Sequence, residues 1–314
     1  MSAEGKLTDD KHLSGSNFPG WNNIHPFMTP LDVYMYVTNA REGKPNPFVD
    51  NIHVRVGTAF ETPVIMELIP QYMPVVDVKT GFTTAYKHLY LPFSVSIDGM
   101  CRAEKITIKE NEVVKTGGGD LFLDGVGIIE TKITDKYCAD HCPDHYKEQL
   151  FAQMECVPEA TWGMVAIVKS AMMWIWVFRK EAKFKHYLEE RVLHFEDCIA
   201  NNNPPDPINS IEVSKIHPKA EVESTILSED TEEIIAQLQS LRSIKANVEK
   251  SIDDAEKVLK MQLGNAEVGF TKGYRVEWPT RTYKAKPEQT IYKEATPEKT
   301  IRLNTLKIRE LDND

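Results

Sequence analysis

The stretch 93–154 limits the possible folds more than any other part of the chain. It begins with alternating Phe93, Val95 and Ile97 separated by serines, a period-two pattern that is typical of a half-buried strand. The later run GVGIIETKI is more continuously apolar, as expected of a central strand covered on both faces. The helical pattern YKEQLFAQM follows soon after it. We therefore predict an α/β (α+β) chain in which helices flank a central mixed β-sheet.

The length and composition of the chain are those of a globular protein. With 314 residues, of which 41% are hydrophobic, it can form one large or two small domains. The five cysteines are odd in number and irregularly spaced, which favours a reducing cytoplasm and no disulfide framework. The N-terminal segment MSAEGKLTDDKH is polar and has no apolar stretch of the signal-peptide kind. The net charge of −10 argues mildly against a passive nucleic-acid coat protein.

The apolar segment 162–178 could be mistaken for a membrane span. Lys169 and Ser170 interrupt it near the middle, and no unbroken apolar run approaches about 18 residues. Two buried strands joined by a turn are therefore predicted, and no membrane partner.

Local signals predict the remaining elements. Thr29 is a good N-cap with Pro30 at the first helical position, so a helix is expected up to Gly43. A second helix is expected over 51–68, with a turn or kink near Pro63. Further strands are predicted at 83–93, 94–98, 105–108, 126–133, 162–168 and 173–179, and further helices at 146–157 and 182–200. The glycine run 117–119 is read as a flexible hairpin.

Four regions follow from this pattern. They are a core domain over 1–206, a linker over 207–228, a long amphipathic helix over 229–264, and a basic C-terminal tail over 265–314 that packs on the core. Apolar residues of the long helix recur in steps of four and three, with Lys245 among them, which is a coiled-coil-like seam. That face packs either on its own domain or on another molecule. The tail is either an ordinary solvated segment or a DNA contact.

Three residues of the two central strands suggest chemistry. Asp98 ends the first apolar run, while Glu130 and Lys132 flank Thr131 in the second and point to the same face. Magnesium prefers hard oxygen ligands and keeps several waters, so two carboxylates and the Thr131 carbonyl suffice to bind it. Lys132 could then reach the attacking water or the phosphate beside the metal. This arrangement predicts a phosphodiester hydrolase of the PD-(D/E)XK nuclease type.

Two features leave alternatives open at this site. A Glu-x-Lys pattern by itself is common on exposed strand edges, where it forms an ordinary salt bridge. Asp124 is a second candidate for the metal ligand in place of Asp98, although Asp124-Gly125 also fits a tight hairpin turn.

A compact Cys/His group offers a different kind of site. Cys138, His141, Cys142 and His145 could bind zinc, but Pro143 interrupts the helical face that they would share, and a loop with incidental thiols is the simpler reading. The sequence contains no P-loop pattern and does not resemble that of a motor protein.

Five segments over about 12–206 resemble, in order, the YqaJ-type viral recombinase family, the phage exonucleases similar to lambda exonuclease. These segments are HLSGSNFPGW with PFMTPLDVY, VGTAFETPVIMELI, SIDGM with IIETKI, YKEQLFAQM, and VLHFEDCIANNNPP. The resemblance implies a restriction-endonuclease-like core. It does not extend to the long helix and the tail.

The resemblance also assigns roles to individual residues. Asp98 and Glu130 match the metal ligands and Lys132 matches the catalytic lysine. Glu61 matches a glutamate that assists the metal, directly or through a water. The remaining assignments are Gln149 for a glutamine that holds the lysine and the substrate, Ser16 for a serine that contacts the DNA 5′-phosphate, and Tyr146 and Gln153 as alternates on the same helix.

The activity implied by the resemblance is a magnesium-dependent 5′→3′ exodeoxyribonuclease, with manganese able to substitute. Such enzymes digest linear double-stranded DNA as trimeric rings, release 5′-mononucleotides, and leave a 3′ single strand for a single-strand annealing protein. The expected location is the cytoplasm, that of the host for a phage protein. This chain has no arginine upstream of Ser16, where Lys6 and Lys11 are the nearest cations. The alternatives are a related nuclease of other polarity or endonuclease activity, and a DNA-end-binding module without turnover.

Overall fold

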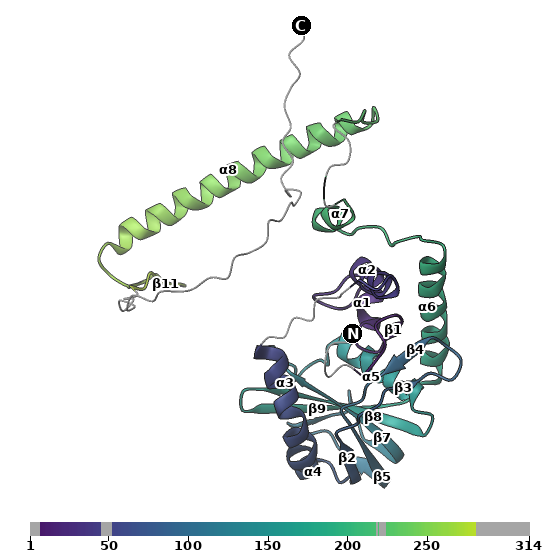
Figure 1. Cartoon of the computed structure of the whole chain (residues 1–314). Helices are drawn as coiled ribbons and strands as arrows, with labels where there is room; N and C mark the ends of the chain where they lie inside the picture. Colours follow the sequence, from purple (N-terminus) through teal and green to yellow (C-terminus); the bar gives the residue numbers. More distant parts are fainter. Residues whose placement is uncertain (1–6, 45–51, 218, 220–223, 281–314) are drawn as a thin grey trace, which may run out of the picture. The chain divides into compact units, whose positions relative to one another are not determined.

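The computed structural model describes residues 7–44, 52–217, 219 and 224–280 (Figure 1). The chain divides into two compact units, Met1–Ile208 and Asn209–Asp314, which we describe separately.

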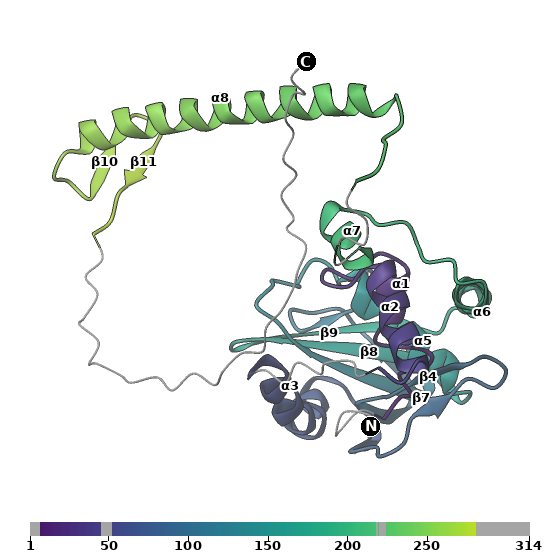
Figure 2. The ribbon, with the colours of Figure 1, turned by 45° about the horizontal axis from the view of Figure 1, so that its top comes forward.

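The first unit is built around a six-stranded mixed sheet. Its strands, in spatial order, are β2 (Val76–Thr80), β5 (Gly99–Ile108), β7 (Leu121–Ile133), β8 (Ala160–Lys169), β9 (Met172–Arg179) and β6 (Val114–Lys115). Strand β7 pairs antiparallel with β5 and parallel with β8, so the run GVGIIETKI is a central strand, as predicted. The mixed sheet flanked by helices confirms the predicted fold class (Figure 2).

Both faces of β7 are buried, which explains its continuous apolar sequence. Ile128 belongs to a core cluster that includes Leu150 and Val192 from the helices on one face. Ile129 belongs to a second cluster with Ile65 and Ile69 on the other face. Neighbouring strand residues point to opposite faces, so two successive isoleucines connect both cores.

The helices of the first unit cover those two faces. They are α1 (Phe18–Trp21), α2 (Pro30–Arg41), α3 (Ile52–Pro63), the π-helix η1 (Val64–Leu68), α4 (Ile69–Tyr72), α5 (Asp144–Cys156) and α6 (Ala182–Ala200). The predicted capping of α2 is confirmed, because the Thr29 hydroxyl accepts from the Asp32 N–H and the Asp32 carboxylate accepts from the Thr29 N–H. The predicted interruption near Pro63 is the one-turn π-helix that follows it.

A small three-stranded sheet connects the N-terminal segment to the main sheet. Strand β4 (Phe93–Val95) pairs in parallel with β1 (Leu13–Ser14) and antiparallel with β3 (Tyr86–Lys87). The segment after β4 leads directly to Asp98 and into β5. Leu13 and Ser14 therefore lie beside the segment that leads to Asp98.

Several predicted strands have different bounds in the structure. The prediction of one strand over 83–93 is wrong except at Tyr86–Lys87 and Phe93. Leu89 is 72% and Tyr90 83% exposed in a turn closed by a hydrogen bond from the His88 N–H to the Phe93 carbonyl. The predicted strand 94–98 ends at Val95, because the Ser96 carbonyl accepts from a glutamine side chain and not from a neighbouring strand.

Two connections also differ from expectation. The glycine run 117–119 has positive φ throughout, but it is not a hairpin, because β6 on one side of it pairs with β9 and not with β7. The linker 207–228 contains a short helix, α7 (Ser210–Ile216), capped by the Asn209 side chain, which accepts from the N–H groups of Ile211 and Glu212.

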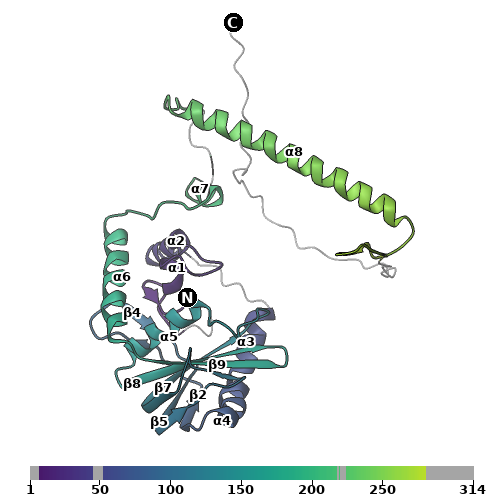
Figure 3. The same cartoon turned by 180° about the vertical axis from the view of Figure 1, so that it is seen from behind.

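The second unit consists mainly of one long helix, α8 (Thr231–Leu263), as predicted (Figure 3). A short antiparallel hairpin follows it, formed by β10 (Val268–Phe270) and β11 (Arg275–Glu277). The rest of the predicted basic tail, 281–314, lies outside the described residues. Among the described helices, none is long and apolar enough to cross a membrane.

Candidate active site

The register of β5 against β7 brings Asp98 beside Glu130. Gly99 pairs with Ile129, so the residue before β5 lies opposite the acidic end of β7. Oδ2 of Asp98 accepts two hydrogen bonds from Thr131, from its N–H at 2.8 Å and from its hydroxyl at 2.9 Å. Within the part of the chain that the structure describes, Oδ1 of Asp98 accepts no hydrogen bond. Asp98 is thus oriented by the neighbouring strand and keeps one oxygen for a ligand.

Glu130 is the most buried acidic side chain of this site, with 1% exposure. Its Oε1 accepts from the Lys132 ammonium and, at 2.8 Å, from the Gln149 amide. Its Oε2 accepts from the Gln153 amide at 2.5 Å. Such burial of a carboxylate is tolerated because donors surround it.

Helix α5 supplies the two glutamines from one face. Gln149 and Gln153 are one turn apart, so both side chains point toward β7. The Gln153 amide also donates to the Ser96 carbonyl at 2.9 Å, which joins α5 to the segment before Asp98. On the other side of that segment, the Thr80 hydroxyl donates to the Asp98 carbonyl at 2.8 Å. The sequence analysis missed Thr80, because nothing in its local pattern indicates a partner eighteen residues away.

Glu61 approaches the same cluster from α3. One turn later in the chain, Ile65 packs directly on Gly99 at the start of β5, where a Cβ added to the glycine would lie only 3.1 Å from the Ile65 side chain. This contact holds the helical segment that carries Glu61 over the start of β5. Burial and the negative charges of Asp98 and Glu130 raise the pKa of Glu61 to about 7. Glu61, Asp98 and Glu130, which the sequence assigned to the site, are thus close enough to interact electrostatically.

The cluster carries more negative than positive charge. Burial, followed by the charge of Asp98, raises the pKa of Glu130. Burial alone would lower the pKa of Lys132, but the charges of Glu130 and Asp98 outweigh that effect and raise it. The direct contact between ammonium and carboxylate favours the ionised pair at neutral pH. Three carboxyl groups thus share one ammonium, an imbalance that a divalent cation would relieve.

The donor set fits magnesium better than a softer metal. Among the described residues, no three His, Cys, Asp or Glu side chains converge closely enough to hold an ion by themselves. Magnesium needs only one or two carboxylates because it keeps several waters. Asp98 and Glu130 are therefore the residues that would hold it, with Glu61 acting through a water. Thr131 differs from expectation in one respect, because its N–H and hydroxyl orient Asp98, whereas only its carbonyl was predicted to take part.

Comparisons with known proteins give limited similarity. Neither the family models nor the curated protein sequences contain a match to this chain. Among solved structures, the chain is similar to an alkaline exonuclease (LHK-Exo) from Laribacter hongkongensis, with 14% identity over 62% of this chain and 91% of that chain and a TM-score of 0.42. The complex of LHK-Exo with dAMP gives the same identity and coverage and a TM-score of 0.43. At these values the similarity carries no weight for function, which has to come from the site itself.

A series of rings extends outward from Lys132. Its ammonium lies 5.6 Å from the Tyr146 ring, and the His145 ring lies 4.1 Å from Tyr146. The His25 ring follows at 5.4 Å from His145, and Phe27, 84% exposed, at 6.1 Å from His25. Burial, followed by the charges of His25 and Lys132, lowers the pKa of His145 to about 4, so it is neutral at physiological pH. The sequence analysis assigned His145 to a possible zinc group and did not single out His25.

The possible zinc group does not form. Cys138 and Cys142 are buried in the core, burial raises the pKa of the Cys142 thiol to about 12, and His145 turns toward His25. His141 lies 3.9 Å from Asp144 on the surface. These residues are a loop and a helix start without metal-binding geometry.

Asp124 also lies apart from the site. It and Gly125 are inside β7, so they form no hairpin turn. Asp124 precedes Glu130 by six residues, which is about 20 Å along a strand. Its carbonyl accepts from the Thr161 hydroxyl at 2.6 Å, and its side chain is exposed. Asp98 is therefore the aspartate that accompanies Glu130.

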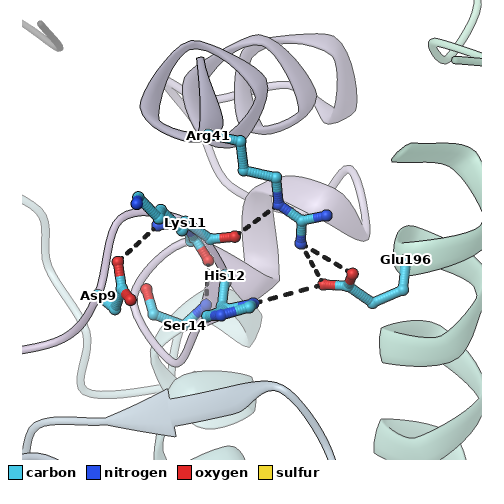
Figure 4. A network of polar contacts seen from close by, with 7 residues as sticks. Asp9, Lys11, His12, Ser14, Arg41 and Glu196 are labelled. Atoms are coloured by element: carbon cyan, nitrogen blue, oxygen red, sulfur yellow. Dashed lines mark hydrogen bonds and ion pairs between the residues drawn. The ribbon is translucent and has the colours of Figure 1, made fainter. Parts of the chain in front are cut away.

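Ser16 follows β1 and lies next to the chain that leads to Asp98. Gly15 donates to the Ser94 carbonyl at 3.1 Å, and the exposed Ser16 hydroxyl lies 3.3 Å from the Ser14 hydroxyl. A cation from α2 reaches this segment, because Arg41 donates to the Lys11 carbonyl at 2.8 Å (Figure 4).

The same arginine is held by an acidic partner. Two hydrogen bonds of 2.7 and 2.8 Å join the Arg41 guanidinium to the Glu196 carboxylate on α6, and His12 lies 3.8 Å from that carboxylate (Figure 4). The sequence showed no arginine upstream of Ser16, and the fold brings one from downstream. Glu196 neutralises it in this arrangement.

Proposed function

We propose that this chain is a magnesium-dependent exonuclease that digests linear double-stranded DNA from the 5′ end and leaves a 3′ single strand. The observation that supports this most is the buried Glu130, held by Lys132, Gln149 and Gln153 beside an Asp98 that keeps one oxygen for a ligand. A purely structural ion pair needs neither the second carboxylate nor the approach of Glu61. The arrangement suits phosphodiester hydrolysis.

The roles of the residues follow from their contacts. A bound divalent ion would polarise the phosphate and lower the pKa of an attacking water. Asp98 and Glu130 would hold it, and Gln149 and Gln153 keep Glu130 aligned. Lys132 would turn from Glu130 toward the phosphate and offset the charge that develops there.

Digestion from the 5′ end requires a contact to the terminal 5′-phosphate. Ser16 stands on the segment beside the path to Asp98, and its exposed hydroxyl could donate to a terminal 5′-phosphate. Lys11 and Arg41 lie near the same segment and could add positive charge. Arg41 could do so only by loosening its pair with Glu196.

We also propose that the enzyme acts as a trimeric ring in the cytoplasm and passes its single strand to an annealing protein, the setting of phage recombination. This rests on the resemblance of the sequence motifs. Manganese is expected to replace magnesium, since it accepts the same oxygen ligands.

The decisive experiment is nucleotide release from linear duplex DNA with magnesium, comparing 5′-labelled with 3′-labelled ends. The wild-type protein should release the 5′ label first. Lys132→Ala should lose cleavage by about 100-fold or more while it still binds DNA. Lys136→Ala is the matched control, because Lys136 is exposed four residues later and should leave the rate unchanged.

Each result has a clear meaning. Early loss of the 3′ label, or internal cuts, would keep the metal site and reject the polarity. Cleavage by Lys132→Ala at the wild-type rate would reject the catalytic assignment. Absence of release with either metal would favour a DNA-end-binding module.

A further inference from the structure

Helix α8 carries a row of apolar side chains without a buried member. None of its residues is buried. Even its apolar side chains are exposed, with more than 50% exposure for each of Ile234, Leu241, Val248 and Ile252. A single helix gains most of its stability from packing an apolar face, so 33 residues of exposed amphipathic helix indicate that something covers it.

The row has the spacing of a coiled-coil seam. Its positions, at alternating steps of four and three, are Ile234, Leu238, Leu241, Lys245, Val248, Ile252, Ala255 and Leu259. In heptad terms Leu238, Lys245, Ile252 and Leu259 take position a, and Ile234, Leu241, Val248 and Ala255 take position d. Four complete a/d layers are therefore available.

The surface of this row is uneven in a way that a second α8 can match. A shallow groove runs from the middle of the helix into its second half, lined by Ile244, Asn247, Val248, Ser251, Ile252 and Ala255, where the small Ser251 and Ala255 leave space. The first half carries the larger Leu238 and Ile244. An antiparallel partner brings the first half of one helix against the second half of the other.

In one antiparallel register, each of the eight seam positions faces a seam position of the second copy. It sets each a residue against a d residue of the second copy, so that Leu238 faces Ala255, Lys245 faces Val248, Ile252 faces Leu241, and Leu259 faces Ile234. Outside the core layers, Ile244 then faces Ser251 of the second copy. Large side chains meet small ones at the groove, which is the packing that a dry interface needs.

The charges select the same direction. A parallel pair in register would set Lys245 against Lys245 of the second copy inside the seam, which is repulsive. The antiparallel pair sets Lys245 next to Glu249 of the second copy, and Arg242 against that glutamate at the flanking position. Within one chain Lys245 already approaches Glu249 at 3.6 Å, so the ammonium can reach along the helix edge.

We propose that α8 is a self-association element that pairs antiparallel with α8 of a second copy of this chain, centred between Ala246 and Asn247. This pairing is separate from the nuclease site and would join protomers whatever assembly the first unit forms. It is independent of the proposed function.

The test uses the full chain. Leu241→Asp with Ile252→Asp places acidic residues in facing core layers, and sedimentation should show the assembly mass fall to half. Ser243→Asp with Lys250→Glu is the matched control, because both positions lie on the opposite side of the helix, and its mass should stay that of the wild type. An unchanged mass for the core variant would overturn the proposal.

The direction is tested by distances between spin labels on introduced cysteines, which can be labelled selectively because all five native cysteines are buried. In the antiparallel register, labels at Glu232 should lie about 40 Å apart, since 29 residues of helix rise separate them. Labels at Asn247 should lie within about 20 Å, the width of two helices. Short distances at both positions would show a parallel pair, and the absence of a defined distance at Asn247 would show no pair; either would overturn the proposal.

Discussion

Gln153 and Glu130 face one another in the interior: the amide nitrogen of Gln153 lies 2.5 Å from Oε2 of Glu130, and each side chain is only 1% exposed. The same amide donates to the Ser96 carbonyl at 2.9 Å, so its orientation is fixed from two directions. A neutral donor from α5 thus determines where the buried carboxylate points.

Replacing Gln153 by alanine should destabilise the fold more than replacing Gln149. Gln153→Ala leaves Oε2 of Glu130 buried without a donor, which costs about 1–3 kcal/mol. Gln149→Ala should cost less, because Gln149 is partly exposed and water can replace its amide. Urea unfolding with a metal chelator measures both variants. Equal losses would mean that the Gln153 contact does not hold Glu130.

Asp98→Asn and Asp124→Asn should separate the two candidate ligands. An asparagine at 98 can still accept from Thr131, so the fold should survive while metal-dependent cleavage drops by about 100-fold. Asp124→Asn should leave both the rate and the magnesium dependence unchanged, because its exposed side chain lies far along β7. A magnesium titration of nucleotide release checks this. A loss confined to Asp124→Asn would reverse the assignment.

The contribution of Glu61 to the stability of the metal-free protein should fall as the pH rises from about 4.5 to about 7. The pKa of Glu61 is about 7 in the folded protein and 4.5 for an unperturbed glutamate, as in the unfolded chain. Between these pH values the folded state keeps a proton that the unfolded state has released. Stability from this group is therefore full below pH 4.5 and lost as pH rises through 7. Because Glu61 is half-buried, the slope should stay below about 1.4 kcal/mol per pH unit.

Two variants and a metal test that origin. Relative to the wild type, Glu61→Gln should lose less stability in urea unfolding as the pH rises from 5 to 8, whereas Glu67→Gln, at an exposed glutamate in the π-helix that follows, should behave like the wild type. Magnesium should restore stability at pH 8, because it binds the ionised carboxylates. Identical slopes for wild type and Glu61→Gln would disprove the effect.

Two glycines should respond in opposite directions to alanine. A Cβ at Gly127 would lie 2.3 Å from the ring of Trp162, its neighbour on β8, which is only 1% exposed, so Gly127→Ala should cost about 1–3 kcal/mol. Gly57 lies inside α3 with open space around it, so Gly57→Ala should add about 0.5–1 kcal/mol. Urea unfolding compares them. A neutral Gly127→Ala would mean that Trp162 can move aside.

Local signals were sufficient for the elements that carry the site. The apolar run around Ile128 and Ile129 identified the central strand, and the spacing of Glu130 and Lys132 placed both on one face of it. The cap at Thr29 located the start of α2. These features depend on neighbours within a few residues, and the sequence records such neighbours directly.

The sequence by itself identified α2, α5, α6, α8 and the second half of β7, and which residues there carry the acidic, amide and lysine groups of the candidate site. Tertiary structure alone decided that Gln153 reaches Ser96, that His25 joins the rings beside Lys132, and that Arg41 arrives near Ser16 from downstream. It also decided against Asp124, since only the register of β5 and β7 shows which aspartate faces Glu130. The physical reason is that period and capping are properties of adjacent residues, whereas register and packing depend on contacts between segments distant in the chain.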